Sequence, residues 1–307
     1  MSVNTVKVNI NGQVYSLTYN GTSGKFEGTM TAPTTSSYNV NAGHYYPVEV
    51  EVKDVAGNIT TIDDTDATLG NSLKLIVKEK VIPTISINSP GANSKLTTNT
   101  PTILFALRDD DSGIDTSTLV ITKDGSTTVN EGATGLSLNS VAGGYDGSYV
   151  LQSALSDGEH TIGIDVKDFD GNIAVSKSVT FVIDTVAPTL NVTAPANGLI
   201  TNVQNQNVVA LTSDATSSPV TVNIVLNGAN QGSVIVDGSG NFSKAISLIE
   251  GENTIVITST DGAGKSTTVN RTVTLDTIAP TISNIEILPN PADAGTTFVI
   301  KITANDL

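Results

Sequence analysis

The 307-residue chain contains no cysteine and no tryptophan, and aromatic residues make up only 4% of it. Without cysteine, no disulfide can join two layers of structure, so the cores must hold by packing alone. The scarcity of aromatic residues predicts cores built from Val, Ile and Leu. No apolar run approaches the roughly 20 residues that span a bilayer as a helix, so we expect no membrane insertion.

Basic residues are also scarce, because 15 Lys and Arg stand against 30 Asp and Glu and give a net charge of −15. Such a surface repels phosphate backbones and anionic lipid surfaces, so we expect no nucleic-acid partner. The charge suits an exterior protein, or one that gathers divalent cations. The first residues show neither the basic start nor the apolar segment of a Sec signal peptide.

Two turn-forming elements recur at a fixed spacing. Asp168 opens the sequence Asp-Phe-Asp-Gly-Asn, and Pro188 follows 20 residues later in Asp-Thr-Val-Ala-Pro. Asp261 opens Asp-Gly-Ala-Gly-Lys, and Pro280 follows 19 residues later in Asp-Thr-Ile-Ala-Pro. Asp and Gly in this order predict a hairpin turn, and a proline that cannot donate to a sheet suits a linker. The spacing therefore marks the end of a repeating unit.

The residues between these turns predict strands. β-branched residues alternate with polar ones before the turn, as at Ile162, Ile164 and Val166. No amphipathic helix is indicated, so the fold class predicted is all-β. With the proline linkers as boundaries, we expect domains at 1–80, 81–186 and 187–278, and a partial unit of two strands at 279–307.

The segments 155–188 and 248–280 resemble the closing hairpins of bacterial immunoglobulin-like (Big-type) repeats. Such repeats are strung in tandem in phage tail proteins and in bacterial surface adhesins. The resemblance implies tandem immunoglobulin-like β-sandwich domains, with a variant first domain, and a non-enzymatic structural or adhesive role. Because no export signal is visible, a phage-tail (virion) protein is the first expectation and a bacterial cell-surface adhesin is the alternative.

Residues suited to catalysis are few. The two histidines, His44 and His160, lie in no motif that would pair them with a nucleophile. The segment Gly262–Thr267 is similar to the end of a phosphate-binding loop, but Ser259 stands where that loop needs glycine. A strand pattern also follows it in place of the required helix. We therefore expect no enzymatic activity.

Acidic residues gather in the predicted turns and linkers. Ca²⁺ takes about six to eight oxygen ligands and needs neither His nor Cys. In cadherins and in some bacterial immunoglobulin-like adhesins, carboxylates of adjoining sandwiches meet at the junction, so the resemblance implies candidate calcium ligands. The alternative is that these residues only cap turns and keep the surface soluble. The candidates are Asp109, Asp110, Asp111, Asp168, Asp170 and Asp184.

Tyrosine clusters are candidates for contact with sugar, because sugar sites present an aromatic face among polar groups. Tyr38, Tyr45 and Tyr46 form the main cluster. They make a secreted glycan-binding protein, with a host-surface glycan as its partner, a further alternative. Tyrosine in strands also packs in cores and on sheet surfaces, which is the competing interpretation.

The last residues predict two strands without the remainder of a unit. Two strands cannot bury an apolar face alone, and their edges are open for pairing with another chain. We expect them to dock by strand addition against another virion or surface protein, or against a second copy in a homo-oligomer. Folding back on the third domain is the alternative. The predicted docking residues are Ile285, Ile287, Phe298, Ile300 and Ile302.

Overall fold

The computed structural model describes residues 2–306, apart from the side chains of residues 127 and 128. Strands make up the regular structure, and the single helical segment among these residues is the short 3-10 helix η1 (Gly70–Leu73). None of the described helices is long and apolar enough to cross a membrane. The chain divides into two units, 1–183 and 184–307. The all-β prediction is confirmed.

The N-terminal residues form one six-stranded sheet, in the order β3-β2-β1-β4-β5 with β6 paired to β4. A turn at Asn11 and Gly12, both with positive φ, joins the first two strands, as an Asn-Gly hairpin requires. We expected two packed sheets here. The buried apolar side chains of this region, Val6, Val8, Tyr46 and Leu73, are too few to fill a layer between two sheets. The strands are β1 (Val3–Ile10), β2 (Gln13–Asn20), β3 (Lys25–Glu27), β4 (Tyr46–Asp54), β5 (Ile59–Ile62) and β6 (Lys74–Leu75).

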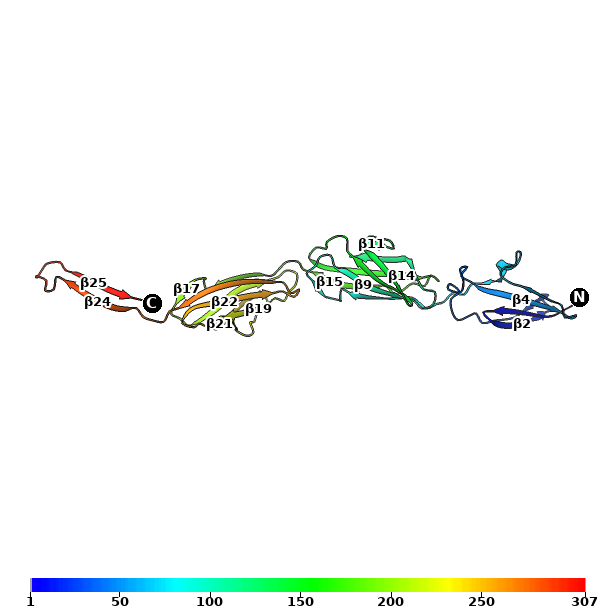
Figure 1. The fold of residues 1–307 in the computed structure, drawn as a ribbon, viewed down its shortest axis with the longest axis horizontal. Coiled ribbons are helices and arrows are strands. Elements are labelled where there is room, and N and C mark those ends of the chain that lie inside the picture. Colours follow the sequence, from blue (N-terminus) through cyan, green and yellow to red (C-terminus); the bar gives the residue numbers. More distant parts are fainter. Residues whose placement is uncertain (1, 307) are drawn as a thin grey trace. The chain divides into compact units, whose positions relative to one another are not determined.

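The rest of the first unit is a sandwich of two sheets (Figure 1). One sheet has the order β11-β10-β14-β15-β8 and the other β12-β13-β9-β7. Inward residues alternate along each strand, as at Ile162, Ile164 and Val166 of β14, and all three are buried. The strands are β7 (Thr84–Ser89), β8 (Lys95–Leu96), β9 (Thr102–Arg108), β10 (Ile114–Lys123), β11 (Thr127–Asn130), β12 (Leu136–Val141), β13 (Gly144–Val150), β14 (Gly158–Asp168) and β15 (Lys177–Ile183).

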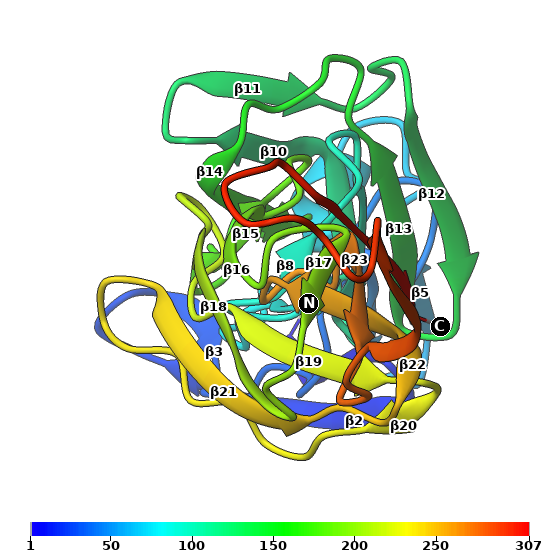
Figure 2. The ribbon, with the colours of Figure 1, turned by 90° about the vertical axis from the view of Figure 1, so that its left-hand side faces the viewer.

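The second unit contains a sandwich of the same kind. Its sheets have the orders β16-β18-β21 and β17-β23-β22-β19-β20. Figure 2 shows β19 beside β22, with β18 and β21 in the other sheet. The core is mostly aliphatic, with Phe242 as its one buried aromatic ring among the described residues. The strands are β16 (Thr189–Ala194), β17 (Leu199–Thr201), β18 (Asn205–Ser213), β19 (Thr221–Leu226), β20 (Ala229–Asn230), β21 (Asn241–Ser247), β22 (Gly251–Thr260) and β23 (Ser266–Leu275).

Both sandwiches contain a parallel pairing between a short early strand and the last strand. In the first sandwich β8 pairs with β15, through Lys95 with Val182 and Leu96 with Ile183. In the second, β17 pairs with β23, from Leu199 with Val273 to Thr201 with Leu275. The last strand of each sandwich, its exit strand, leads directly to a linker. Backbone hydrogen bonds to the short edge strand, β8 or β17, hold this exit strand in the sheet.

The final residues form a separate two-stranded sheet of β24 (Thr281–Leu288) and β25 (Val299–Asn305). Ile285 pairs with Ile302 and Ile287 pairs with Ile300, so the four side chains lie on one face of the sheet. These four and Phe298 are all more than 40% exposed. The two strands fall where the sequence predicts them, whereas docking of this face against a partner stays a prediction.

Replacing Gly147 with alanine tests the packing of the first sandwich. A Cβ at this position would lie 2.2 Å from Cζ of Phe105, whose ring is buried and covers Gly147 across the sheet. We expect Gly147→Ala to lower the free energy of unfolding by about 1–3 kcal/mol, the usual cost of overpacking. Chemical denaturation of both proteins measures the difference.

Gly91→Ala is the matched control, because a Cβ at Gly91 meets no atom within 4 Å. It should change the free energy of unfolding by less than about 0.5 kcal/mol. Equal effects of the two substitutions would show that contact with the Phe105 ring is not the cause.

Candidate functional site

Four turns in the chain share the sequence Asp-x-x-Gly and one pattern of hydrogen bonds. In each, Oδ1 of the aspartate accepts a hydrogen bond from the backbone N–H four residues later, at 2.8–3.0 Å. The aspartates are Asp54, Asp168, Asp237 and Asp261. Hydrogen bonds accepted from Asn58 and from Asn241 lower the pKa of Asp54 and of Asp237, respectively, because they stabilise the charged form. The turn-capping role predicted from the sequence is therefore present at all four positions.

The four turns differ in burial. Asp237 is exposed, whereas only 1% of Asp168 and 6% of Asp261 is exposed. Each of the two buried aspartates lies beside two further carboxylates. Because Asp237 makes the same turn at the surface, capping of the turn requires neither burial of the aspartate nor neighbouring carboxylates.

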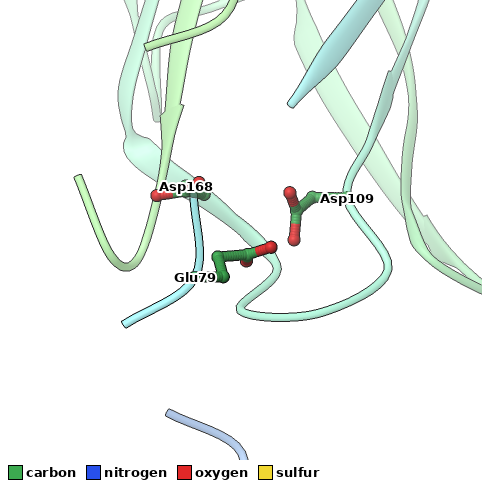
Figure 3. Close-up of side chains that lie close together, drawn as sticks. All are labelled: Glu79, Asp109 and Asp168. Atoms are coloured by element: carbon green, nitrogen blue, oxygen red, sulfur yellow. The ribbon is translucent and has the colours of Figure 1, made fainter. Parts of the chain in front are cut away.

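In the first unit, Asp168 lies with Glu79 and Asp109, and one carboxylate oxygen of each lies within 4.8 Å of the others. Figure 3 shows Glu79 with Asp109 on one side and Asp168 on the other. Asp109 directly follows β9, and its Oδ1 accepts hydrogen bonds from the N–H groups of Asp111 at 3.1 Å and Gly113 at 2.8 Å. We name Glu79, Asp109 and Asp168 the first carboxylate cluster.

Glu79 enters this cluster from the segment before β7. Its Oε1 accepts a hydrogen bond from the N–H of Ser112 at 2.6 Å, while its Oε2 is buried without a partner. Burial raises the pKa of Glu79; the hydrogen bond from Ser112 opposes that shift, and the charges of Asp109 and Asp111 add to it. The buried hydroxyl of Ser112 likewise has no partner.

In the second unit, Asp261 lies with Asp184 and Asp214, again with one oxygen of each within 4.8 Å. Asp214 directly follows β18, and its Oδ1 accepts hydrogen bonds from Thr216 N at 2.8 Å and Ser217 N at 2.5 Å. Asp184 is fully buried, and its Oδ1 accepts a 3.2 Å hydrogen bond from Val186 N. We name Asp184, Asp214 and Asp261 the second carboxylate cluster.

The structure separates the six predicted calcium ligands. Asp109 and Asp168 lie in the first cluster and Asp184 in the second. Asp110, Asp111 and Asp170 belong to neither cluster among the described residues, and two of them instead bind backbone. Both oxygens of Asp111 accept from Ser36 N at 2.9 and 3.0 Å, and Asp170 Oδ2 accepts from Glu79 N at 3.0 Å. The structure therefore does not group these three aspartates with the two clusters, and their role as calcium ligands stays a prediction.

The sequence analysis missed Glu79, Asp214 and Asp261. Glu79 stands four residues before Pro83, as Asp184 stands four residues before Pro188. Asp109 and Asp214 each follow the second long strand of a sandwich, β9 and β18. Superposing the repeats position by position, rather than searching for runs of acidic residues, would have revealed these correspondences.

The tyrosines do not form an open platform for a sugar ring. Tyr46 is buried, with 3% exposure, and its hydroxyl lies 2.6 Å from Thr35 Oγ1. Tyr38 is stacked on both faces, by the ring of His44 at 4.0 Å and by Phe169 at 4.1 Å. Tyr45 donates a hydrogen bond to Asp64 and has the Lys74 ammonium 5.1 Å from its ring centre. Tyr46 is therefore buried and both ring faces of Tyr38 are covered, while a glycan site at Tyr38, Tyr45 and Tyr46 stays a prediction.

Comparison with known families matches residues 188–277 to the family described as Glucodextranase, domain B. Among curated proteins, the PII-type proteinase and the PI-type proteinase of Lactococcus lactis subsp. cremoris are each 27% identical over 157 residues. That match covers 48% of this chain and 8% of each relative, so this chain corresponds to a small part of those proteins.

The chain is also similar to solved structures of tandem β-sandwich modules. The immunoglobulin domains 1–5 of Sidekick-1 are 11% identical, with a TM-score of 0.37, over 99% of this chain and 60% of that one. The fibronectin(III)-like modules of Clostridium thermocellum CbhA are 14% identical, with a TM-score of 0.36, over 62% of this chain and 94% of that one.

Asp111→Ala should loosen the contact between the segment around Ser36 and the loop after β9. The substitution removes both acceptors of the Ser36 amide, and a hydrogen bond to a charged acceptor contributes about 1.5–3 kcal/mol. We expect hydrogen exchange of the Ser36 amide to become about tenfold faster or more.

Asp110→Ala is the control, since it removes a neighbouring carboxylate that accepts no hydrogen bond from Ser36. It should leave exchange at Ser36 unchanged. Acceleration by both variants alike would assign the effect to net charge instead of to the Asp111 hydrogen bonds.

Proposed function

We propose that this chain is a non-catalytic structural and adhesive protein that acts outside the cell, on a bacterial surface. The observation that carries the proposal is the repetition of a whole unit. Two successive sandwiches share a parallel exit-strand pairing, an acidic linker residue four positions before proline, and a buried Asp-x-x-Gly turn. Repetition of a complete scaffold suits a protein that spaces or displays binding surfaces.

The relatives support an accessory role. The chain matches a small part of proteins named as proteinases, and one segment matches a domain named as part of a glucodextranase. We infer from these partial matches that the chain is a module of the kind that accompanies a catalytic region. The described buried side chains that could do acid–base chemistry bind backbone amides of their own loops, as Asp109 and Asp261 do. In this role the purified chain should hydrolyse neither peptide nor glucan substrates.

Brief trypsin treatment of intact cells of the producing organism tests the location. Lys78 and Lys80 are exposed in the segment that precedes β7, so cleavage there should release peptides of this chain from whole cells. We expect those peptides, identified by mass spectrometry, before any peptide of a ribosomal protein appears.

Recovery of the peptides only after lysis would contradict a surface location. If the peptides are recovered with purified phage particles and not with washed cells, the protein belongs to the virion, as first expected from the sequence, and not to the cell surface. Turnover of a peptide or glucan substrate by the folded chain would contradict the non-catalytic part of the proposal.

A further inference from the structure

The second carboxylate cluster contains buried oxygen atoms that no protein group satisfies. Asp261 uses Oδ1 to accept hydrogen bonds from Ala263 N at 2.8 Å and Lys265 N at 3.0 Å, and its Oδ2 is buried without a partner. Asp184 Oδ2 is likewise buried and unpartnered, in a residue with no exposed surface. Burying a carboxylate oxygen without a partner is costly, so we expect an ion or an ordered water at these atoms.

The turn-capping role does not explain this arrangement. Asp237 accepts hydrogen bonds from Ser239 N and Asn241 N, two and four residues later, as Asp261 does, but it remains exposed and belongs to no carboxylate cluster. Formation of the turn therefore does not require the buried, unpartnered Oδ2 atoms of Asp184 and Asp261.

The second cluster also gathers three carboxylates at one place. Three ion pairs of the described residues, Lys7 with Glu51, Arg108 with Asp146 and His160 with Asp124, do not include a cluster carboxylate. Three carboxylates within 4.8 Å of one another, two of them buried, repel each other when charged, and a cation between them would remove that repulsion.

A buried serine of the second unit lies beside this cluster, because the carbonyl oxygen of Ser217 accepts a 2.8 Å hydrogen bond from Gly262 N, next to Asp261. Ser217 is fully buried, and its hydroxyl has no hydrogen-bond partner. It lies three residues after Asp214 in the same loop, and its own N–H donates to the Asp214 carboxylate. The available donors are thus carboxylates and a hydroxyl, with no nitrogen or sulfur among them, which suits Ca²⁺ better than transition metals. Mg²⁺ fits less well, because it holds its waters and is usually bound by one or two carboxylates.

The first cluster repeats the same plan. Glu79 takes the linker position of Asp184, Asp109 takes the position of Asp214, and Asp168 takes that of Asp261. The spacing from Asp109 to Ser112 equals that from Asp214 to Ser217, and the Ser112 hydroxyl and Glu79 Oε2 are again buried without partners. One difference is that Asp168 Oδ2 accepts a 2.7 Å hydrogen bond from Asn172 Nδ2, whereas Asp261 Oδ2 has no partner. The linker carboxylate and the loop serine are unsatisfied in both clusters, and this recurrence indicates a built site.

We propose that each cluster binds one Ca²⁺ ion: Asp184, Asp214, Asp261 and Ser217 form one site, and Glu79, Asp109, Asp168 and Ser112 form the other. Each site is complete within its own unit. The cation joins the linker residue to two loops of the sandwich that follows it in the chain, and backbone carbonyls or water complete the coordination. This inference does not depend on a surface location.

Calcium titration of the chelator-treated full chain tests the proposal. We expect calorimetry to show about two Ca²⁺ ions per chain, with Mg²⁺ binding at least about tenfold more weakly. Asp261→Asn keeps the Oδ1 acceptor of the turn and removes one charged ligand, so about one site should remain. Asp109→Asn combined with Asp261→Asn should abolish both sites.

Melting temperatures measured with and without Ca²⁺ show whether Asp261 acts as a calcium ligand or only stabilises the fold. In EGTA, Asp261→Asn should melt no lower than the unaltered chain, because it relieves repulsion within the cluster. In 1 mM Ca²⁺ the unaltered chain should gain about 5 °C or more, and the variant clearly less. Ser217→Ala should behave in the same way, with Ca²⁺ affinity at that site reduced about tenfold.

Asp237→Asn is the matched control, since it changes the same kind of turn outside the clusters. It should retain about two Ca²⁺ ions and the full thermal gain. The proposal is overturned if the unaltered chain binds no Ca²⁺, if Asp261→Asn retains both sites, or if Asp237→Asn loses as much as Asp261→Asn.

Discussion

The ends of the units depend on one interaction, the hydrogen bonds that an aspartate carboxylate accepts from amides of its own turn. In each Asp-x-x-Gly turn the carboxylate satisfies N–H groups that the sheet leaves free, and glycine supplies a positive φ. At Asp168 and Asp261 the turn fixes where the last long hairpin of a sandwich reverses. At these two positions it also places a negative charge where the linker residue and the loop after the second long strand of the sandwich bring two more.

The two sandwiches and the N-terminal sheet differ in how much apolar surface they bury. The first sandwich surrounds Phe105 and Phe181 with aliphatic side chains, and the second relies almost wholly on Val, Ile and Leu. The N-terminal sheet buries four apolar residues. It is also held by polar contacts, such as those between Asp111 and the Ser36 amide. Since apolar burial is the main driving force of folding, this sheet should open most readily.

Local pattern predicted most of the fold, because strands and turns are encoded by neighbouring residues. The alternation at Ile162, Ile164 and Val166 and the hairpin turns opened by Asp168 and Asp261 could be predicted from the sequence, and the structure has both. Only half of the residues in the carboxylate clusters were predicted as ligands from the sequence. Glu79 and Asp168 lie far apart in the chain, so their meeting depends on strand order, which spacing alone does not give.

Aromatic residues were the least predictable from pattern. Tyr38 and Tyr46 stand close together in sequence, yet Tyr46 enters the core, and Tyr38 stacks between His44 and a ring more than a hundred residues away. A tyrosine in a strand or loop presents an apolar body and a polar tip in either situation. The sequence therefore could not say whether its ring faces were free.

The parallel pairing of the exit strands has a mechanical consequence. If a pull acts on the second sandwich through the segment before β16 and through Asp276, β17 and β23 are drawn in opposite directions along their length. The backbone bonds from Gly198 N to Thr272 O and from Asp276 N to Thr201 O then carry the load together, in shear, instead of parting one after another. The first sandwich has the same device in the bond from Val182 N to Ser94 O. Each sandwich is thus constructed to resist tension along its strands far better than a force that peels its edge.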